Sequence, residues 1–313
     1  MTMKIPTVKL SALSAAARRS LLQRSAVPDP SMRAAAAEIV ATVRTGGDGA
    51  LAAANAKYGG GANTLRVEPA ELHRALADVE PGVRTALERA TENIRRGHAP
   101  QRPQDQSLET VPGVRIDRLW TPLRRIGVYV PGGRAAYPSS LLMGVIPAQV
   151  AGVPEIVVTS PADENGEVSS VILAAAALLG VDEVYLTGGA QAIGALAYGT
   201  ETIRPVDKIV GPGNAWVTAA KLAVYGDVGV DLPAGPSEAL VIADKTADPR
   251  IIAADLMCQA EHGPESPVAL ATPDAEFAGA VVDQIQQLLG RLERDSIIRE
   301  ALENHGLIAI TED

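Results

Sequence analysis

Apolar residues in the middle of the chain occur in short runs that alternate with longer stretches of helical character. Four such runs have the length of buried strands and stand at residues 127–130, 155–159, 183–187 and 208–210. Short apolar strands that alternate with helices are typical of a parallel sheet with crossover helices. The pattern therefore predicts an α/β fold whose central part is a parallel sheet.

Glycine-containing turns connect these predicted strands to the helices that follow them, with PGG at 131–133, GG at 188–189 and GPGN at 211–214. In a parallel sheet, such turns bring several helix N-termini to the carboxyl edge, where open α/β sheets bind ligands. Helix N-termini favour anionic groups such as phosphates. None of the turns has the GxGxxG dinucleotide pattern, and GPGN comes closest without the third glycine. Two interpretations stay open: a nucleotide site, or glycines that only form tight turns.

The segments before this region are predicted to be mainly helical. Residues 1–26 form a helical arm, which is either solvated or docked on a partner subunit. Residues 31–58 are an Ala-rich helix pair broken at two consecutive glycines, and residues 68–96 are helical again. Residues 98–113 contain three prolines and are predicted as a loop, whereas residues 114–119 alternate as a half-buried strand does.

The C-terminal part continues the alternation of strands and helices. A loop rich in proline and glycine at 231–238 precedes a strand at 240–243, and a helix capped by Asp248 then runs to the Gly-Pro pair at 263–264. Further strands and helices follow, and the last predicted strand is 306–310. An alternation that stops inside a strand leaves its last sheet edge and helix crossover unfinished.

Two polar side chains mark the end of the helix that Asp248 begins. Gln259 and His262 are three residues apart, so the helical pattern places them on one face in the last turn. A carbonyl oxygen and an imidazole nitrogen at this spacing can share one metal ion, and the imidazole is the stronger anchor for zinc. Glutamine is an uncommon zinc ligand, however, and an open catalytic site takes three protein ligands. By themselves the two residues fit a solvated helix end as well as a metal site.

Composition excludes several classes of protein. The 313 residues are 47% hydrophobic, which suffices for the core of one large domain or two ordinary ones. The net charge of −9 disfavours nucleic acid as a partner. No apolar run is long enough to cross a bilayer, the N-terminus lacks a signal-peptide core, and the single cysteine, Cys258, excludes an internal disulfide. We therefore predict a cytoplasmic protein without membrane contact, in which Cys258 is a small core residue.

Five segments together resemble the histidinol dehydrogenase family, and they occur in the family's order. They are GVYVPGG at 127–133, GGAQAI at 188–193, VDKIVGPGN at 206–214, DLPAGPSE at 231–238 and QAEHGP at 259–264. The resemblance implies a zinc-dependent homodimer that catalyses the last step of histidine biosynthesis. In that step L-histidinol is oxidised through an aldehyde to L-histidine in two successive NAD-linked reactions.

The resemblance assigns zinc and substrate contacts to residues of the C-terminal part. Gln259 and His262 match zinc ligands that also contact the substrate, and Ser237 matches a substrate contact. The ordinary alternative for Ser237 is a capping or loop hydrogen bond.

NAD contacts are implied for Tyr129, Gln191 and Asn214, which match cofactor-binding positions of the family. Each lies at or just beyond the end of a predicted strand, as a site on the sheet edge requires. Tyr129 also fits a core aromatic residue.

The resemblance further implies two Rossmann-like domains behind the N-terminal helical arm of residues 1–26. The first domain consists of residues 27–128 and 237–313 and is incomplete at its C-terminus. The second, NAD-binding domain consists of residues 129–236 and is inserted into the first.

The family's remaining catalytic groups have no match in this chain. A Glu-His pair that transfers protons, an aspartate ligand of zinc and a histidine of the partner subunit all lie beyond Asp313 in the family pattern. His305 lacks a matching motif and fits a helix C-terminus. We therefore expect a C-terminally truncated form with little or no turnover. Two alternatives stay open: a related NAD-dependent alcohol dehydrogenase of the same superfamily, and a non-catalytic nucleotide-binding α/β module.

Overall fold

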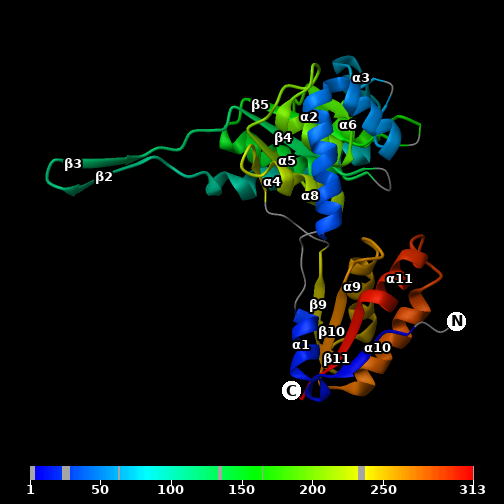
Figure 1. Cartoon of the computed structure of the whole chain (residues 1–313). Helices are drawn as coiled ribbons and strands as arrows, with labels where there is room; N and C mark the ends of the chain where they lie inside the picture. Colours follow the sequence, from blue (N-terminus) through cyan, green and yellow to red (C-terminus); the bar gives the residue numbers. More distant parts are fainter. Residues whose placement is uncertain are drawn as a thin grey trace. The chain divides into compact units, whose positions relative to one another are not determined.

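The computed structural model describes residues 4–22, 29–62, 64–132, 136–163, 165–231 and 237–312. The predicted arm beyond residue 22, the last glycine of the PGG turn and most of the 231–238 loop lie outside these ranges. The chain forms two compact units, and each is described by itself (Figure 1). The first unit joins Met1–Ala26 to Gly235–Asp313, and the second unit, Val27–Ala234, is inserted into it. Among the described residues, no helix combines the length and the apolar character that a bilayer span needs.

The second unit is built on a five-stranded parallel sheet with the strand order β6-β5-β4-β7-β8. The strands are β4 (Arg125–Tyr129), β5 (Glu155–Ser160), β6 (Glu183–Leu186), β7 (Lys208–Val210) and β8 (Gly229–Val230). The chain enters the sheet at its centre in β4, fills one side through β6 and returns to the other side at β7, as in a doubly wound fold. The predicted parallel sheet is confirmed, and only β8, with two residues, escaped the sequence pattern.

Helices cover both faces of this sheet. The crossover helices are α5 (Pro138–Ala151), α6 (Ser170–Leu178), α7 (Gly189–Tyr198) and α8 (Ala215–Val224). Three earlier helices pack on them: α2 (Pro30–Tyr58) on α7 and α8, α3 (Pro69–Asp78) on α6, and α4 (Pro81–His98) on α5. The side chains of consecutive residues in a strand pack into two separate cores, with Val128 in one and Tyr129 in the other. Burial on both faces is the reason for the continuous apolar runs in the sequence.

Glycine and proline set the internal boundaries of these outer helices. Gly47 has a non-helical backbone (φ 53°, ψ −142°) inside α2, which confirms the predicted break. The helical character predicted for residues 68–96 is confirmed, and two helices share it, because α3 ends at Asp78 and α4 begins at Pro81. Glu80 caps α4 by accepting hydrogen bonds of 2.8 Å from the N–H groups of Gly82 and Val83.

An antiparallel hairpin projects from the second unit (Figure 1). It consists of β2 (Gln106–Val111) and β3 (Val114–Arg118), which follow the short 3-10 turn η2 (Ala99–Gln101). The predicted strand at 114–119 is confirmed by β3, but its predicted half-burial is wrong, because all residues of both strands are exposed. The predicted loop at 98–113 is wrong where β2 forms. The alternation in the sequence reflects one apolar face of the hairpin. A register shift after Glu109 brings Val111 opposite Val114, on the face of the Leu108–Ile116 pair.

The first unit contains a four-stranded parallel sheet with the order β1-β11-β10-β9. Its strands are β1 (Thr7–Lys9), β9 (Ala239–Ile242), β10 (Val268–Thr272) and β11 (Gly306–Ile310). Its helices are η1 (Leu10–Ala12), α1 (Ala15–Leu22), α9 (Pro249–Ala260), α10 (Ala275–Leu288) and α11 (Asp295–His305). The N-terminal arm is therefore not purely helical. Because β1 pairs with β11, the last predicted strand does not leave an open sheet edge.

The division of the chain into units differs from the predicted domains. The prediction joined residues 27–128 to the C-terminal segment, whereas these residues belong to the second unit. The reason is packing: α2 lies against α7 and α8, and β4 starts at Arg125 inside the sheet that was assigned to residues 129–236. The N-terminal residues 1–26 belong to the first unit through β1.

A buried ion pair joins the amino ends of three strands of the second unit. Arg125 is 6% exposed, and its guanidinium donates hydrogen bonds of 2.9 and 2.7 Å to the two carboxylate oxygens of Glu183. Glu155 accepts a further bond of 2.9 Å from Arg125. Hydrogen bonding to Arg125 lowers the pKa of Glu183 from 4.5 to about 2. The three side chains stand at the starts of β4, β5 and β6 and tie these strands together.

We expect Glu183→Gln to destabilise the protein by about 3 kcal/mol at pH 7, because it removes the carboxylate that binds the buried Arg125 through both oxygens and leaves only the contact with Glu155. The pKa of Glu183 is lower in the folded than in the unfolded state. Its contribution to stability is therefore complete above pH 4.5 and is lost as the pH falls toward about 2. Urea unfolding of wild type and variant across this range will show the difference between them shrinking. A difference that stays constant down to about pH 2 would contradict the assignment.

Candidate functional site

The carboxyl ends of β4 and β7 meet at the point where the sheet order reverses. Tyr129 is the last residue of β4, and Gly211 follows the last residue of β7. Gly211 has a φ of 116°, and a Cβ atom at this position would overlap the carbonyl oxygen of Tyr129. From here the chain leaves β4 toward α5 and β7 toward α8, which lie on opposite faces of the sheet. Open α/β sheets bind ligands in the crevice at such a switch point.

The Tyr129 side chain connects β4 with the start of α7. Tyr129 is 4% exposed, and its hydroxyl accepts a hydrogen bond of 3.2 Å from the N–H of Gly189, the first residue of α7. Burial raises the pKa of the Tyr129 hydroxyl. The residue therefore stands at the carboxyl edge of the sheet and, at the same time, has the environment of a core aromatic residue.

Gln191 lies in the first turn of α7 and is held by α2. It is 2% exposed, and its amide nitrogen donates to the Asn55 side-chain oxygen at 3.2 Å and to the Gly59 carbonyl at 3.3 Å. The same Asn55 oxygen accepts a bond of 2.9 Å from Thr187, which follows β6. Asn55 was missed by sequence reasoning, and its only signal was a polar residue in an Ala-rich helix just before three glycines.

Asn214 is the exposed member of the predicted NAD contacts. It caps α8, because its side-chain oxygen accepts hydrogen bonds of 3.1 and 3.2 Å from the N–H groups of Trp216 and Val217. Its NH₂ group is the remaining donor beside the N-terminus of the helix. The structure thus brings Tyr129, Gln191 and Asn214 to the same edge of one sheet.

A buried ion pair that sequence reasoning missed fixes the Gly211 turn. Lys221 in α8 is 5% exposed, and its ammonium group donates to the Gly211 carbonyl and, at 2.5 Å, to the Asp231 carboxylate. The other oxygen of Asp231 accepts a bond of 2.8 Å from the N–H of Gly211. Burial lowers the pKa of Lys221, and its bond to Asp231 opposes that shift. The only signal in the sequence was a lysine in an otherwise apolar helix.

Three predicted residues of the first unit lie around the end of α9. The helix ends at Ala260, so Gln259 stands in its last turn, whereas His262 lies just beyond the helix, contrary to the prediction. The helix thus ends before the predicted Gly-Pro stop. Gln259 donates a bond of 2.7 Å from its amide nitrogen to the Ser237 carbonyl. This bond leaves the carbonyl oxygen of Gln259, the atom that binds cations, on the other branch of the amide.

The imidazole of His262 is oriented by backbone carbonyls. Its Nδ1 lies 3.0 Å from the Cys258 carbonyl oxygen and 3.2 Å from that of Gln259. A hydrogen on Nδ1 satisfies these contacts and leaves Nε2 as the ligand atom, which is how metal-binding histidines are commonly held. Within the described ranges, however, no three His, Cys, Asp or Glu residues gather in a way that would hold a metal ion. Cys258 itself is exposed, so its prediction as a core residue is wrong.

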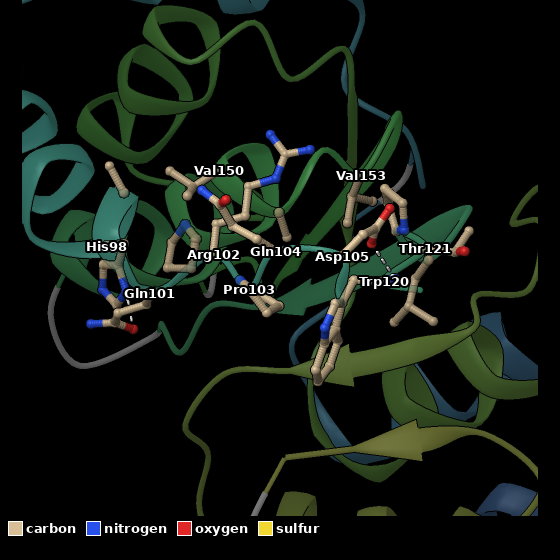
Figure 2. A pocket seen from close by; sticks show the side chains of 15 residues that line it. His98, Gln101, Arg102, Pro103, Gln104, Asp105, Trp120, Thr121, Val150 and Val153 are labelled. Carbon is tan, nitrogen blue, oxygen red and sulfur yellow. Dashed lines mark hydrogen bonds between the residues drawn. The ribbon is translucent and has the colours of Figure 1, made fainter. Parts of the chain in front are cut away.

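One cavity of the second unit lies away from these residues. It has a volume of about 930 Å³ and stands at the base of the hairpin, where Trp120 and Arg102 face it (Figure 2). The backbone N–H of Trp120 donates a hydrogen bond of 2.8 Å to the Asp105 carboxylate there. None of the predicted site residues lines this cavity. A smaller cavity of about 520 Å³ reaches Gly211, Lys221 and Asp231 at the sheet edge.

Comparisons with known proteins agree on one family. The family model "Histidinol dehydrogenase" matches residues 22–313. The histidinol dehydrogenase of Methanothermobacter thermautotrophicus is 45% identical over 314 residues, which are 100% of this chain and 72% of the relative. That of Geobacillus kaustophilus is 48% identical over 281 residues, 90% of this chain and 66% of the relative. The crystal structure of histidinol dehydrogenase from Elizabethkingia anophelis superimposes with a TM-score of 0.89 at 37% identity, over 100% of this chain and 72% of that one.

The close approach of Gly211 to Tyr129 predicts that a side chain at position 211 lowers the free energy of unfolding. Gly226 has a similar φ of 105°, but a Cβ atom there would meet nothing within 4 Å, so Gly226→Ala serves as a control for backbone strain alone. We expect about 1–2 kcal/mol of destabilisation for Gly226→Ala and about 2 kcal/mol more for Gly211→Ala, which adds the clash with the Tyr129 carbonyl. Urea unfolding of both variants measures the difference. Equal losses would show that the β4–β7 junction has room for a side chain.

Proposed function

Because the chain belongs to the histidinol dehydrogenase family, we propose that its second unit binds NAD at the carboxyl edge between β4 and β7. The observation that carries the proposal is the placement of Tyr129, Gln191 and Asn214 along the carboxyl edge of a doubly wound sheet whose switch point lies between β4 and β7. The N-termini of α7 and α8 begin at the same edge and suit the pyrophosphate of a dinucleotide. The Asn214 side chain is the exposed polar group beside them.

We propose that Gln259 and His262 supply part of a zinc site and that Ser237 contacts the substrate, L-histidinol. The support is local: the Nδ1 atom of His262 faces carbonyl oxygens, and the Gln259 amide nitrogen is tied to Ser237. Both residues thus have one ligand atom left over. Two ligands fall short of the three that an open catalytic zinc site takes, so they are proposed as members of a larger set. When bound, zinc would orient and polarise the amino alcohol.

When bound, NAD would accept one hydride from the alcohol carbon of L-histidinol and, as a second molecule, another from the hydrated aldehyde. Each oxidation would also release one proton from a hydroxyl group, so that the product would be the carboxylic acid L-histidine. The residues proposed here bind and orient the two reactants, and the cofactor carries the electrons. No proton-transferring residue is proposed among residues 1–313, and a cytoplasmic location stays a prediction.

NAD titration of three variants against wild type tests the cofactor site. Asn214→Ala removes both the helix cap and the amide, whereas Asn214→Ser keeps a capping oxygen and removes only the amide. We expect both to bind NAD about tenfold more weakly than wild type if the amide contacts the dinucleotide. Asp274→Ala, which removes the equivalent cap of α10 in the first unit, should leave NAD affinity unchanged.

The same preparations separate the family reaction from its alternatives. Zinc that binds to wild type and is lost in His262→Ala, together with NADH formed from histidinol, supports the proposed function. NADH formed only from other amino alcohols favours a related dehydrogenase, and NAD binding without zinc or NADH favours a binding module. No binding of NAD by wild type would overturn the proposal.

We also propose that the protein is a homodimer and that the hairpin takes part in the contact. The family resemblance implies the dimer, and an isolated two-stranded hairpin has little stability in water unless its apolar face is covered. Here that face is formed by four half-exposed side chains: Leu108, Val111, Val114 and Ile116. The opposite face is polar, with Arg115 and Asp117 in an ion pair.

Sedimentation velocity over a range of concentrations tests the role of the hairpin. We expect Ile116→Lys to raise the dimer dissociation constant about tenfold or more, because it places a charge in the apolar face. Ser107→Lys carries the same added charge on the polar face, opposite Asp117, and should leave the dimer intact. Equal dimerisation of both variants would exclude the hairpin from the contact.

A further inference from the structure

We propose that Lys221 and Asp231 are positioning residues of the dinucleotide site, which hold the Gly211 turn in the one conformation that presents Asn214 to the cofactor. The inference rests on the proposed NAD site of the second unit. It assigns a role to two residues outside the set matched to the family's site.

The pair binds the backbone of Gly211 on both sides. Asp231 accepts the Gly211 N–H at 2.8 Å, Lys221 donates to the Gly211 carbonyl, and the two side chains bind each other at 2.5 Å. Both polar groups of one peptide residue are therefore committed to a single ion pair. Three residues later Asn214 begins α8, and Lys221 belongs to that helix. The pair thus connects the turn, the helix that follows it and the segment after β8.

The turn needs such a restraint because the residue at position 211 must be glycine. A side chain at position 211 would overlap the Tyr129 carbonyl, so the close approach of β4 and β7 excludes every other residue. Glycine has the largest backbone freedom, and an unrestrained glycine here would let the GPGN turn take several conformations. Hydrogen bonds from a charged pair to both its N–H and its carbonyl remove that freedom at the residue where it is largest.

A contribution to the stability of the fold is a weak explanation for the Lys221–Asp231 ion pair. Removing the Lys221 charge from water is costly, and an apolar pair of similar size is often as stable as a buried ion pair. The surroundings of Lys221 in α8 are apolar and would accept such a replacement. What an apolar pair does not provide is a donor and an acceptor for the two backbone groups of Gly211. The charges therefore act on the geometry of the turn.

The same sheet offers a matched control. Arg125 and Glu183 form a second buried ion pair, at the amino edge, where the side chains bind each other rather than a turn. Glu183→Gln should lower stability and leave NAD affinity unchanged. Any general effect of a weakened second unit on NAD binding will appear in this variant as well.

The experiment compares Lys221→Met, the apolar double variant Lys221→Met/Asp231→Leu, and Glu183→Gln in the full chain. NAD affinity is measured by titration, stability by urea unfolding, and the Gly211 N–H by hydrogen exchange in protein labelled with ¹⁵N-glycine. Lys221→Met leaves the Asp231 carboxylate without its cation, and if this prevents folding, the double variant carries the test. The double variant removes that lone charge, so it should regain stability relative to Lys221→Met.

We expect the double variant to bind NAD about tenfold or more weakly than wild type even though its stability recovers, and its Gly211 N–H to exchange faster. Glu183→Gln should keep both wild-type affinity and wild-type exchange at Gly211. Wild-type affinity in the double variant, or a loss of affinity that follows stability in all three variants, would overturn the inference and leave the proposed function intact. Wild-type protein that binds no NAD would overturn both.

Discussion

The contact between the Gly211 backbone and the Tyr129 carbonyl is the constraint on which the second unit's proposed site depends. Two parallel strands, β4 and β7, pair at the centre of the sheet, and their chains then leave toward opposite faces. This divergence creates the crevice, and the tight approach beneath it admits only glycine. The Lys221–Asp231 pair holds that glycine, and Tyr129 in turn holds the first residue of α7. The edge is therefore built from side chains that bind backbone groups.

The two edges of this sheet use charge in different ways. At the amino edge, Arg125 and its carboxylate partners join three strand ends through side-chain contacts alone. At the carboxyl edge, the Lys221–Asp231 pair binds the backbone of the Gly211 turn. Neutral groups from α2 bind Gln191 in the helix that follows β6. Charged or amide groups that bind backbone restrict the conformation of a loop, which matters where a ligand must meet a helix N-terminus.

In the first unit, too, polar side chains are oriented by bonds to backbone groups. The end of α9 presents Gln259 and His262, and each has one polar atom bound to a carbonyl oxygen and one ligand atom left over. Ser237 is joined to this helix end through its own carbonyl, so the three residues matched to zinc and substrate contacts form one local group. This local group is the part of the first unit for which we propose zinc and substrate contacts, and the zinc set proposed for it includes two of the described residues.

Local information in the sequence determined most strands of the two parallel sheets, the break of α2 at Gly47, the cap at Asp248 and, through the resemblance, the family. These features depend on periodicity and on residues within one turn of each other. Only the tertiary structure decided that the alternating segment at 114–118 is an exposed hairpin, that β1 closes the edge of β11, and that residues 27–128 pack with the inserted unit. It also paired Asn55 with Gln191 and Lys221 with Asp231. Exposure and long-range partners follow from which surfaces meet, and no local pattern encodes that.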